Sequence, residues 1–202
     1  MTAAHICESK KLRAPKGITL TSKSDFKAVT FQGEKHLAKV LALDNSIDIC
    51  LMFVQGLTTI KPVELARRAP KVGDKIYNVG APAGFFEPGM VSVLEGRYAG
   101  NSPTSPMSLY SLPATGGSSG SMILNHKGRL LSVLHSVHWR FHHITLATTY
   151  EDTMKFIKRE LKYHLTYRND MEVLKLQNIF KIEEPKKLKP KAKPKKPANA
   201  PK

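Results

Sequence analysis

Short β-like runs separated by turn residues fill most of this chain and limit its fold more than any other feature. The runs alternate apolar and polar residues or are continuously apolar, and they recur at roughly 8–12-residue spacing with Gly, Pro, Asn and Ser between them. This pattern predicts an all-β fold, a barrel or a sandwich. Clear examples between Gly17 and Ala147 are AKVLAL, IDICLMFV, KIYNVG, MVSVLEGRY, RLLSVLHSVH and HITLAT.

One segment after these runs has a different period. Within Tyr150–Tyr167 the apolar residues recur at helical spacing, and Lys and Arg fill the opposite face. Thr149 is a suitable N-cap, and acidic residues follow it in the first turn. We therefore expect one amphipathic helix that closes the β domain. Its apolar positions are Met154, Ile157, Leu161 and Leu165.

Positive charge is concentrated at the C-terminal end. The 202 residues contain 32 Lys and Arg against 16 Asp and Glu, a net charge of +16. Residues 181–202 alone hold nine lysines, five prolines and two glutamates, a net of +7. This composition lacks the apolar residues that would offset the entropy of ordering, so Lys181–Lys202 is expected to be a disordered arm. Such an arm could bind nucleic acid nonspecifically.

Three short segments, each weak alone, occur in an order that indicates nucleophilic catalysis. They are TAAH with His5, IDICLM with Asp48 in an otherwise apolar run, and GGSSGS with Ser119 just before an expected strand. A serine hydroxyl needs a neighbouring base, which His5 would supply, and a carboxylate such as Asp48 would orient the imidazole and stabilise its cation. Each segment alone also fits a simpler explanation: a surface histidine, a turn aspartate or a flexible linker.

The glycines of the third segment have a chemical use as well. Glycine beside Ser119 lets the backbone turn sharply, so that the amides of Gly117 and Ser119 can point at one spot. Two amides arranged in this way would stabilise the oxyanion of a tetrahedral intermediate.

Together these segments resemble the chymotrypsin-like serine peptidase superfamily. TAAH, an Asp before ICLM and GGSSGS follow the family pattern, VGDKIYNVGAPAG is similar to a segment of HtrA-type and viral members, and NHKGRLLSVLHS is similar to the hairpin after the nucleophile. The resemblance implies a serine endopeptidase with a polypeptide substrate and no cofactor. In it His5 is the general base, Asp48 the orienting acid and Ser119 the nucleophile, with Gly117 and Ser119 as the oxyanion hole.

The family fold that this resemblance implies is a pair of six-stranded antiparallel β-barrels followed by a C-terminal helix. The implied division is a first barrel over 1–70, a second barrel with the closing helix over 71–167, and a linker with the basic tail over 168–202. About three strands of the family's first barrel precede TAAH, so we expect this barrel to be incomplete. A fragment of a longer reading frame or a wrongly chosen start is the favoured explanation, and strands supplied by another chain are the alternative.

Substrate preference is the finest inference from the resemblance. Ser111 to Ser118 contains no carboxylate, which argues against cleavage after Arg or Lys. His135 resembles the pocket histidine of viral peptidases that cut after Gln or Glu, and Thr115 resembles their pocket threonine. An imidazole can donate a hydrogen bond to a side-chain carbonyl or carboxylate. The resulting hypothesis is viral polyprotein processing after Gln or Glu; the alternative for His135 is packing inside its strand.

Other features bear on compartment and cofactors. Cys7 and Cys50 are expected to be buried free thiols, since in secreted relatives the partner of the cysteine after the histidine lies upstream. The chain opens without a signal-peptide pattern and has no apolar run long enough to span a bilayer, so an intracellular protein is expected. No metal site is expected, because no cysteine or carboxylate lies within the cluster of His135, His138, His142 and His143.

A second hypothesis belongs to a different functional class. The chain could be a catalytically incompetent protein, or fragment, of peptidase fold that binds nucleic acid through Lys181–Lys202. Its lysines would neutralise phosphates without reading sequence, and binding would fall steeply with salt.

Overall fold

The computed structural model describes residues 1–8, 11–12, 20–21, 26–57 and 60–167. The chain divides into two compact units, Met1–Tyr163 and His164–Lys202. The basic arm predicted at Lys181–Lys202 lies outside the described residues. Within the described part of the chain, no helix is both long and apolar enough to cross a membrane.

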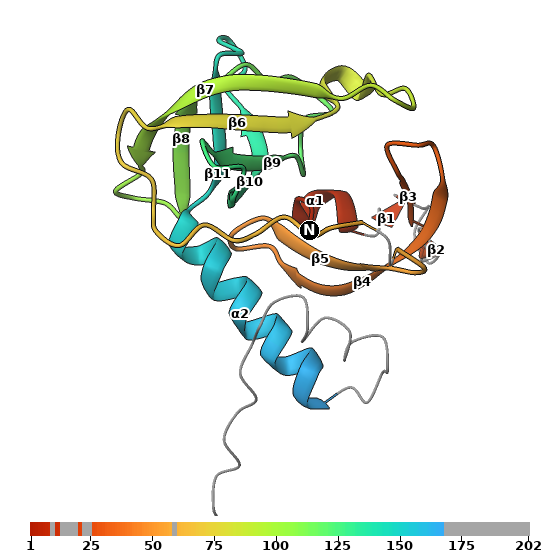
Figure 1. The fold of residues 1–202 in the computed structure, drawn as a ribbon. Helices are drawn as coiled ribbons and strands as arrows, with labels where there is room; N and C mark the ends of the chain where they lie inside the picture. The colour runs from red at the N-terminus through yellow and green to blue at the C-terminus, as the bar shows by residue number, and fades with distance from the viewer. Residues whose placement is uncertain (9–10, 13–19, 22–25, 58–59, 168–202) are drawn as a thin grey trace, which may run out of the picture. The chain divides into compact units, whose positions relative to one another are not determined.

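Six antiparallel strands close into the predicted second barrel (Figure 1). Their order around the barrel is β10-β11-β8-β7-β6-β9, so β9 pairs with both β6 and β10 and completes the closure. Tight turns predicted from the sequence connect them, including the Asn125–Gly128 turn, in which the Gly128 amide donates to the Asn125 carbonyl. The strands are β6 (Lys75–Gly80), β7 (Ser92–Asn101), β8 (Met107–Ser111), β9 (Met122–Asn125), β10 (Leu130–Val137) and β11 (Ile144–Thr148).

Alternating apolar side chains of these strands fill the barrel. In β6 and β8 every second residue is buried, as the period-two pattern requires, whereas β10 is buried continuously over residues 130–134. Tyr110 is the largest fully buried side chain, and its ring packs against Tyr98 with centroids 5.4 Å apart. Other members of this core are Ile76, Leu112, Ile123, Leu131, Leu134 and Ala147.

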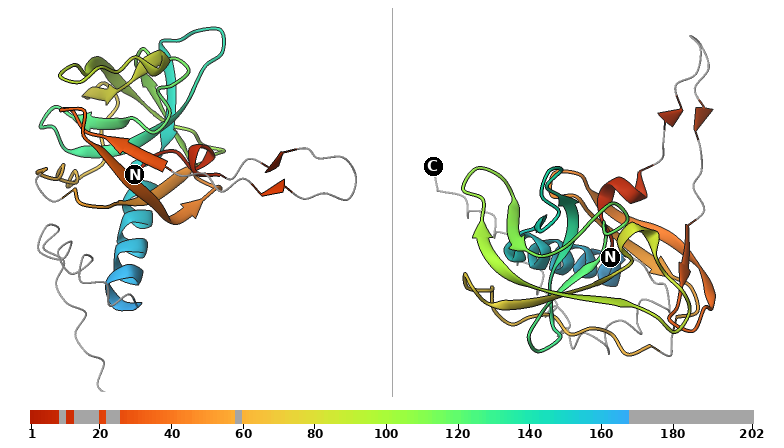
Figure 2. Two further views of the ribbon diagram at one scale, coloured as in Figure 1. Left: turned by 90° about the vertical axis from the view of Figure 1, so that its right-hand side faces the viewer. Right: turned by 90° about the horizontal axis from the view of Figure 1, so that it is seen from above.

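The first half of the unit is an open sheet in the part that the structure describes (Figure 2). Three antiparallel strands, β3 (Phe26–Val29), β4 (Lys35–Asp44) and β5 (Ile49–Val54), form it in sequence order. A short helix, α1 (Ala4–Cys7), contacts β4 and β5, and β1 (Lys11–Leu12) pairs with β2 (Leu20–Thr21). Among the described residues, these strands do not close into a barrel.

Buried contacts hold the two halves together. Ile49 of β5, Val133 of β10 and Phe156 of the C-terminal helix form one apolar cluster. The Thr148 hydroxyl donates a 2.7 Å hydrogen bond to the Ile47 carbonyl, 101 residues away in sequence. The turn that carries Asp48 is therefore fixed to the second half of the unit by apolar and polar contacts on both sides of this residue.

The helix α2 (Tyr150–Tyr167) has the predicted bounds and the predicted cap. The Thr149 hydroxyl accepts a 3.1 Å hydrogen bond from the Asp152 amide and donates one of 2.7 Å to the Asp152 carboxylate. Met154, Ile157 and Leu161 are buried as predicted, and Phe156, which the pattern did not indicate, is buried as well.

The prediction of free thiols was wrong, because Cys7 and Cys50 form a disulfide. The sequence argument sought a partner upstream of the histidine, whereas the partner lies 43 residues downstream on β5. Backbone hydrogen bonds between Thr2 and Cys50, of 2.9 and 2.8 Å, bring the N-terminal segment alongside β5 and place the two cysteines together. Free thiols would have favoured a reducing compartment, and the disulfide removes that argument.

Removal of this disulfide should destabilise the protein substantially. For a closed loop of this length, the loss of unfolded-state entropy corresponds to about 4 kcal/mol. The double variant Cys7→Ala/Cys50→Ala should lose about that free energy of unfolding in urea denaturation. Reductant should lower the stability of the wild type and leave the double variant unaffected; a wild type insensitive to reductant would contradict the pairing.

Candidate active site

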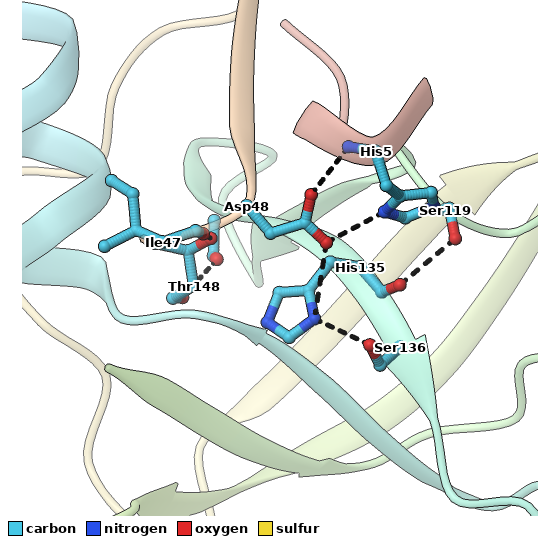
Figure 3. A network of polar contacts seen from close by, with 8 residues as sticks. His5, Ile47, Asp48, Ser119, His135, Ser136 and Thr148 are labelled. Carbon is cyan, nitrogen blue, oxygen red and sulfur yellow. Dashed lines mark hydrogen bonds and ion pairs between the residues drawn. The ribbon is translucent and has the colours of Figure 1, made fainter. Parts of the chain in front are cut away.

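His5 and Asp48 meet where α1 packs beside the start of β5 (Figure 3). The backbone amide of His5 donates to Asp48 Oδ1 at 2.9 Å, and His5 Nδ1 lies 2.8 Å from Asp48 Oδ2. The imidazole is half exposed, and the carboxylate is only 26% exposed. With Nδ1 donating to the carboxylate, Nε2 is the nitrogen left to exchange a proton.

Asp48 lies in the turn before β5 rather than inside the strand, which begins at Ile49. Its backbone is left-handed, with φ of 52°, a conformation that Asp tolerates better than most residues. Burial raises the pKa of the Asp48 carboxyl, because it disfavours the charged form. The amide and the imidazole of His5 donate hydrogen bonds to the carboxylate and lower this pKa, and the positive charges of His5 and His135 lower it further. Together they hold the pKa of this carboxyl below its usual value.

Ser119 lies in the turn before β9, in the same cluster as His5 and Asp48 (Figure 3). Its hydroxyl donates a 3.1 Å hydrogen bond to the backbone carbonyl of His135 on β10. Among the described residues, no hydrogen bond joins Ser119 Oγ to His5. The structure thus brings the three predicted residues together, with the histidine–aspartate pair formed and the serine directed at a carbonyl.

Two glycines of the GGSSGS turn allow other segments to approach the serine. Gly117 has φ of 90°, and a Cβ there would lie 2.6 Å from the Gly84 nitrogen in the turn after β6. Gly120 has φ of 88°, and a Cβ there would overlap the Thr2 hydroxyl. The turn is therefore enclosed by the APAG turn on one side and by the N-terminal segment on the other.

The amides predicted to stabilise an oxyanion are available in this turn. No hydrogen bond among the described residues uses the N–H of Gly117 or Ser119, whereas the Ser118 amide bonds the Thr115 carbonyl and the Gly120 amide the Leu134 carbonyl. Neighbouring amides thus fix the turn, while these two donors stay open to a ligand.

His135 lies close to Asp48, and sequence reasoning, which had singled out both residues, did not predict this contact. Its imidazole is 11% exposed, and Nδ1 lies 4.0 Å from Asp48 Oδ2 and 2.9 Å from the Ser136 hydroxyl. Burial is the main reason why the pKa of His135 lies below the ordinary 6.5, and the nearby charge of His5 lowers this pKa further. The charge of Asp48 and a hydrogen bond with the Ala147 backbone raise the pKa but do not outweigh burial. Asp48 therefore lies between two imidazoles.

Thr115, the other predicted specificity residue, lies at the start of the serine turn. Its amide donates to Ser118 Oγ at 3.2 Å, and its carbonyl accepts the Ser118 amide at 3.0 Å. In the part of the chain that the structure describes, no hydrogen bond joins Thr115 to His135. Across that same part, no group of three or more His, Cys, Asp or Glu is arranged to hold a metal ion.

The position of the disulfide had a sequence signal. Each cysteine lies two residues after a member of the histidine–aspartate pair, Cys7 after His5 and Cys50 after Asp48. If the pair is brought together, the cysteines are brought together too. The contact between His135 and Asp48 has no comparable signal, since it depends on how β10 crosses the start of β5.

Comparison with known proteins places the chain among peptidase domains. The model of the trypsin-like peptidase domain family matches residues 1–133. No curated protein matches the chain. The fold is similar to that of the serine endoprotease from Yersinia pestis, with a TM-score of 0.63, 16% identity and coverage of 79% of this chain and 52% of that one.

A second similar structure is the active form of the Rv3671c protease from M. tuberculosis. It matches with a TM-score of 0.52 and 18% identity over 60% of this chain and 57% of that one. The chain therefore spans less than two thirds of the length of either structure.

Substitution of Gly120 should be far more costly than that of a glycine in open space. Gly120→Ala and Gly128→Ala both place a side chain at positive φ, which costs about 1 kcal/mol. Only Gly120→Ala also overlaps Thr2, which adds about 1–3 kcal/mol of overpacking. Urea denaturation measures the difference; equal losses would contradict the close approach of the N-terminal segment.

Burial of His135 should make stability fall as the pH decreases. Above about pH 6.5 the imidazole is neutral in both states; below it the unfolded chain takes up a proton that the folded protein resists. His135→Gln should therefore gain stability relative to the wild type between about pH 7.5 and pH 5.5. Urea denaturation at each pH measures this, with His138→Gln, at an exposed site in the next turn, as control. A constant difference would contradict the lowered pKa of His135.

Proposed function

The chain belongs to the trypsin-like peptidase domain family, and from that premise we propose that it is a serine endopeptidase that acts through an acyl-enzyme. The observation that carries the proposal is the convergence of His5, Asp48 and Ser119 from three separate segments. An isolated histidine–aspartate pair could be structural. Here the pair lies beside a turn serine and two amides that make no hydrogen bond among the described residues, so a base, a nucleophile and oxyanion donors are together in one place.

In the proposed reaction His5 Nε2 takes the proton of Ser119 Oγ as that oxygen bonds to the substrate carbonyl carbon. The carbonyl electrons move to oxygen, and the resulting oxyanion accepts hydrogen bonds from the amides of Gly117 and Ser119. Collapse breaks the carbon–nitrogen bond, and His5 gives its proton to the leaving amine. A water then repeats the sequence on the acyl-enzyme and releases Ser119.

The hydroxyl of Ser119 must first leave the His135 carbonyl. Rotation about the Cα–Cβ bond is a low-barrier motion of an exposed or half-buried serine, so the observed hydrogen bond describes a resting state. Catalytic hydrogen bonds in unliganded enzymes are often long or unformed and tighten when substrate binds.

Asp48 is suited to the role of orienting acid. Its two oxygens bond two different groups of His5, which fixes the ring and its tautomer at once. The lowered pKa keeps the carboxylate charged at neutral pH, so that it can stabilise the imidazolium that forms during proton transfer.

We further propose that the peptidase prefers Gln or Glu before the cleaved bond and that it processes a viral polyprotein. The support for these proposals is the lack of a carboxylate in Ser111 to Ser118, which removes a partner for Arg or Lys, together with His135 and Thr115 near the serine turn. His135 also contacts Asp48, so a change there can alter both substrate preference and the basicity of His5.

The assignment of the nucleophile can be tested with a fluorophosphonate probe, which labels an activated serine covalently. The wild type should be labelled, Ser119→Ala should not, and His5→Ala should label about a thousandfold more slowly. Ser111→Ala, an exposed serine at the end of β8, is the matched control and should label like the wild type. Labelling that persists in Ser119→Ala excludes this nucleophile, and an unlabelled wild type supports the incompetent-fold hypothesis.

Substrate preference can be measured with a library of peptides that vary the residue before the cleaved bond. We expect Gln or Glu to be favoured, since an imidazole can donate to either side chain. His135→Gln should reduce this preference, as KM for these peptides rises relative to KM for others. Preferred cleavage after Arg or Lys would remove the specificity role of His135.

A further inference from the structure

A basic pocket of about 270 Å³ opens on the second barrel and shares no lining residue with the candidate active site. It lies among the segment before β6, the start of β6 and the turn between β9 and β10. Five Lys or Arg side chains line it against a single carboxylate, that of Asp74. The cations are Arg67, Arg68, Lys75, Lys127 and Arg129.

Hydrogen bonds make the walls of this pocket rigid. Asn125 Oδ1 accepts from the amides of Lys127 and Arg129 at 2.9 and 3.0 Å, which fixes the turn between the two strands. On the facing wall, the Ala66 amide donates to the Leu130 carbonyl at 2.9 Å. The cationic side chains on both walls of the pocket therefore project from backbone that is fixed by hydrogen bonds.

Three of the five cations are neutralised by carboxylates. Arg129 pairs with Glu64 at 3.0 Å and Lys75 with Glu95 at 2.9 Å. Arg68 lies 3.8 Å from Asp74, a carboxylate that also accepts the Lys71 amide.

Arg67 and Lys127 have no carboxylate within ion-pair distance in the described part of the chain. One lies in the segment before β6 and the other on the β9–β10 turn, so uncompensated positive charge faces the pocket from two sides. Such an arrangement attracts an anion rather than an apolar or neutral ligand.

We propose that this pocket binds the phosphodiester backbone of nucleic acid. Guanidinium groups form planar, paired hydrogen bonds to phosphate oxygens, and lysine adds a point charge. A polymer of regularly spaced phosphates also suits a chain whose net charge is +16, since residues outside the pocket can neutralise further phosphates. No Phe, Tyr or Trp is among the described lining residues, and contacts to phosphate oxygens carry no sequence information, so we expect binding to depend little on sequence.

The test compares two double charge reversals in the full chain. Arg67→Glu/Lys127→Glu changes the pocket, and Lys155→Glu/Lys158→Glu changes two exposed lysines of α2 that lie outside it. Both variants alter the net charge equally and both keep the basic arm, so long-range attraction and the contribution of the arm are matched. The probe is fluorescein-labelled single-stranded RNA, followed by anisotropy over a range of salt concentrations.

The pocket variant should bind the RNA about tenfold or more weakly, and the α2 variant within about threefold of the wild type. Loss of two phosphate contacts should also reduce the slope of log affinity against log salt by about 1.4 in the pocket variant alone. Equal losses in the two variants, or a wild type that does not bind, would overturn the proposal. Competition by poly-glutamate as effective as that by unlabelled RNA would also overturn it, because the ligand would then be any acidic chain.

Labelling at Ser119 keeps this result separate from the proposed peptidase activity. Neither reversal touches His5, Asp48 or Ser119, so both variants should label with the fluorophosphonate like the wild type. Normal labelling also shows that the variants are folded. A protein that binds RNA but is not labelled would contradict the peptidase proposal and leave the pocket supported.

Discussion

The carboxylate of Asp48 is the constraint on which the arrangement of the site depends. A charged group that is three-quarters shielded from solvent must be compensated, and His5 does so with both its backbone and its ring. The Thr148 hydroxyl donates a hydrogen bond to the carbonyl of Ile47, the residue before Asp48. His135 contacts the carboxylate itself. Contacts from the second half of the unit therefore support a pair whose two members both come from the first half.

The disulfide and the histidine–aspartate pair join the same two segments. Cys7 follows His5 on α1, and Cys50 follows Asp48 on β5, so the covalent bond and the ion pair lie two residues apart on each side. An ion pair whose imidazole is half exposed contributes little by itself to the stability of a short helix. The covalent link supplies that restraint and leaves the carboxylate free to orient the imidazole.

Periodic and local features of the fold could be predicted from the sequence, whereas contacts between distant segments could not. The strands of the second barrel follow from alternation and turn residues, and α2 follows from its apolar spacing and the Thr149 cap. The proximity of His5, Asp48 and Ser119 was predicted through family resemblance, not through periodicity. The left-handed backbone of Asp48 and the approach of His135 depend on tertiary packing, which no local pattern encodes. The disulfide could be inferred only after His5 and Asp48 were paired, because each cysteine lies two residues after one of them.

One strand supports both the candidate active site and the basic pocket. Arg129 directly precedes β10 and lines the pocket, while His135, near the other end of the strand, contacts Asp48. Six residues of extended chain separate them, a distance of about 20 Å. At that separation salt screens one charged ligand from the other. If both proposals hold, a polypeptide at Ser119 and a phosphate backbone at Lys127 would occupy separate sites, and nucleic acid would retain the peptidase while it cleaves.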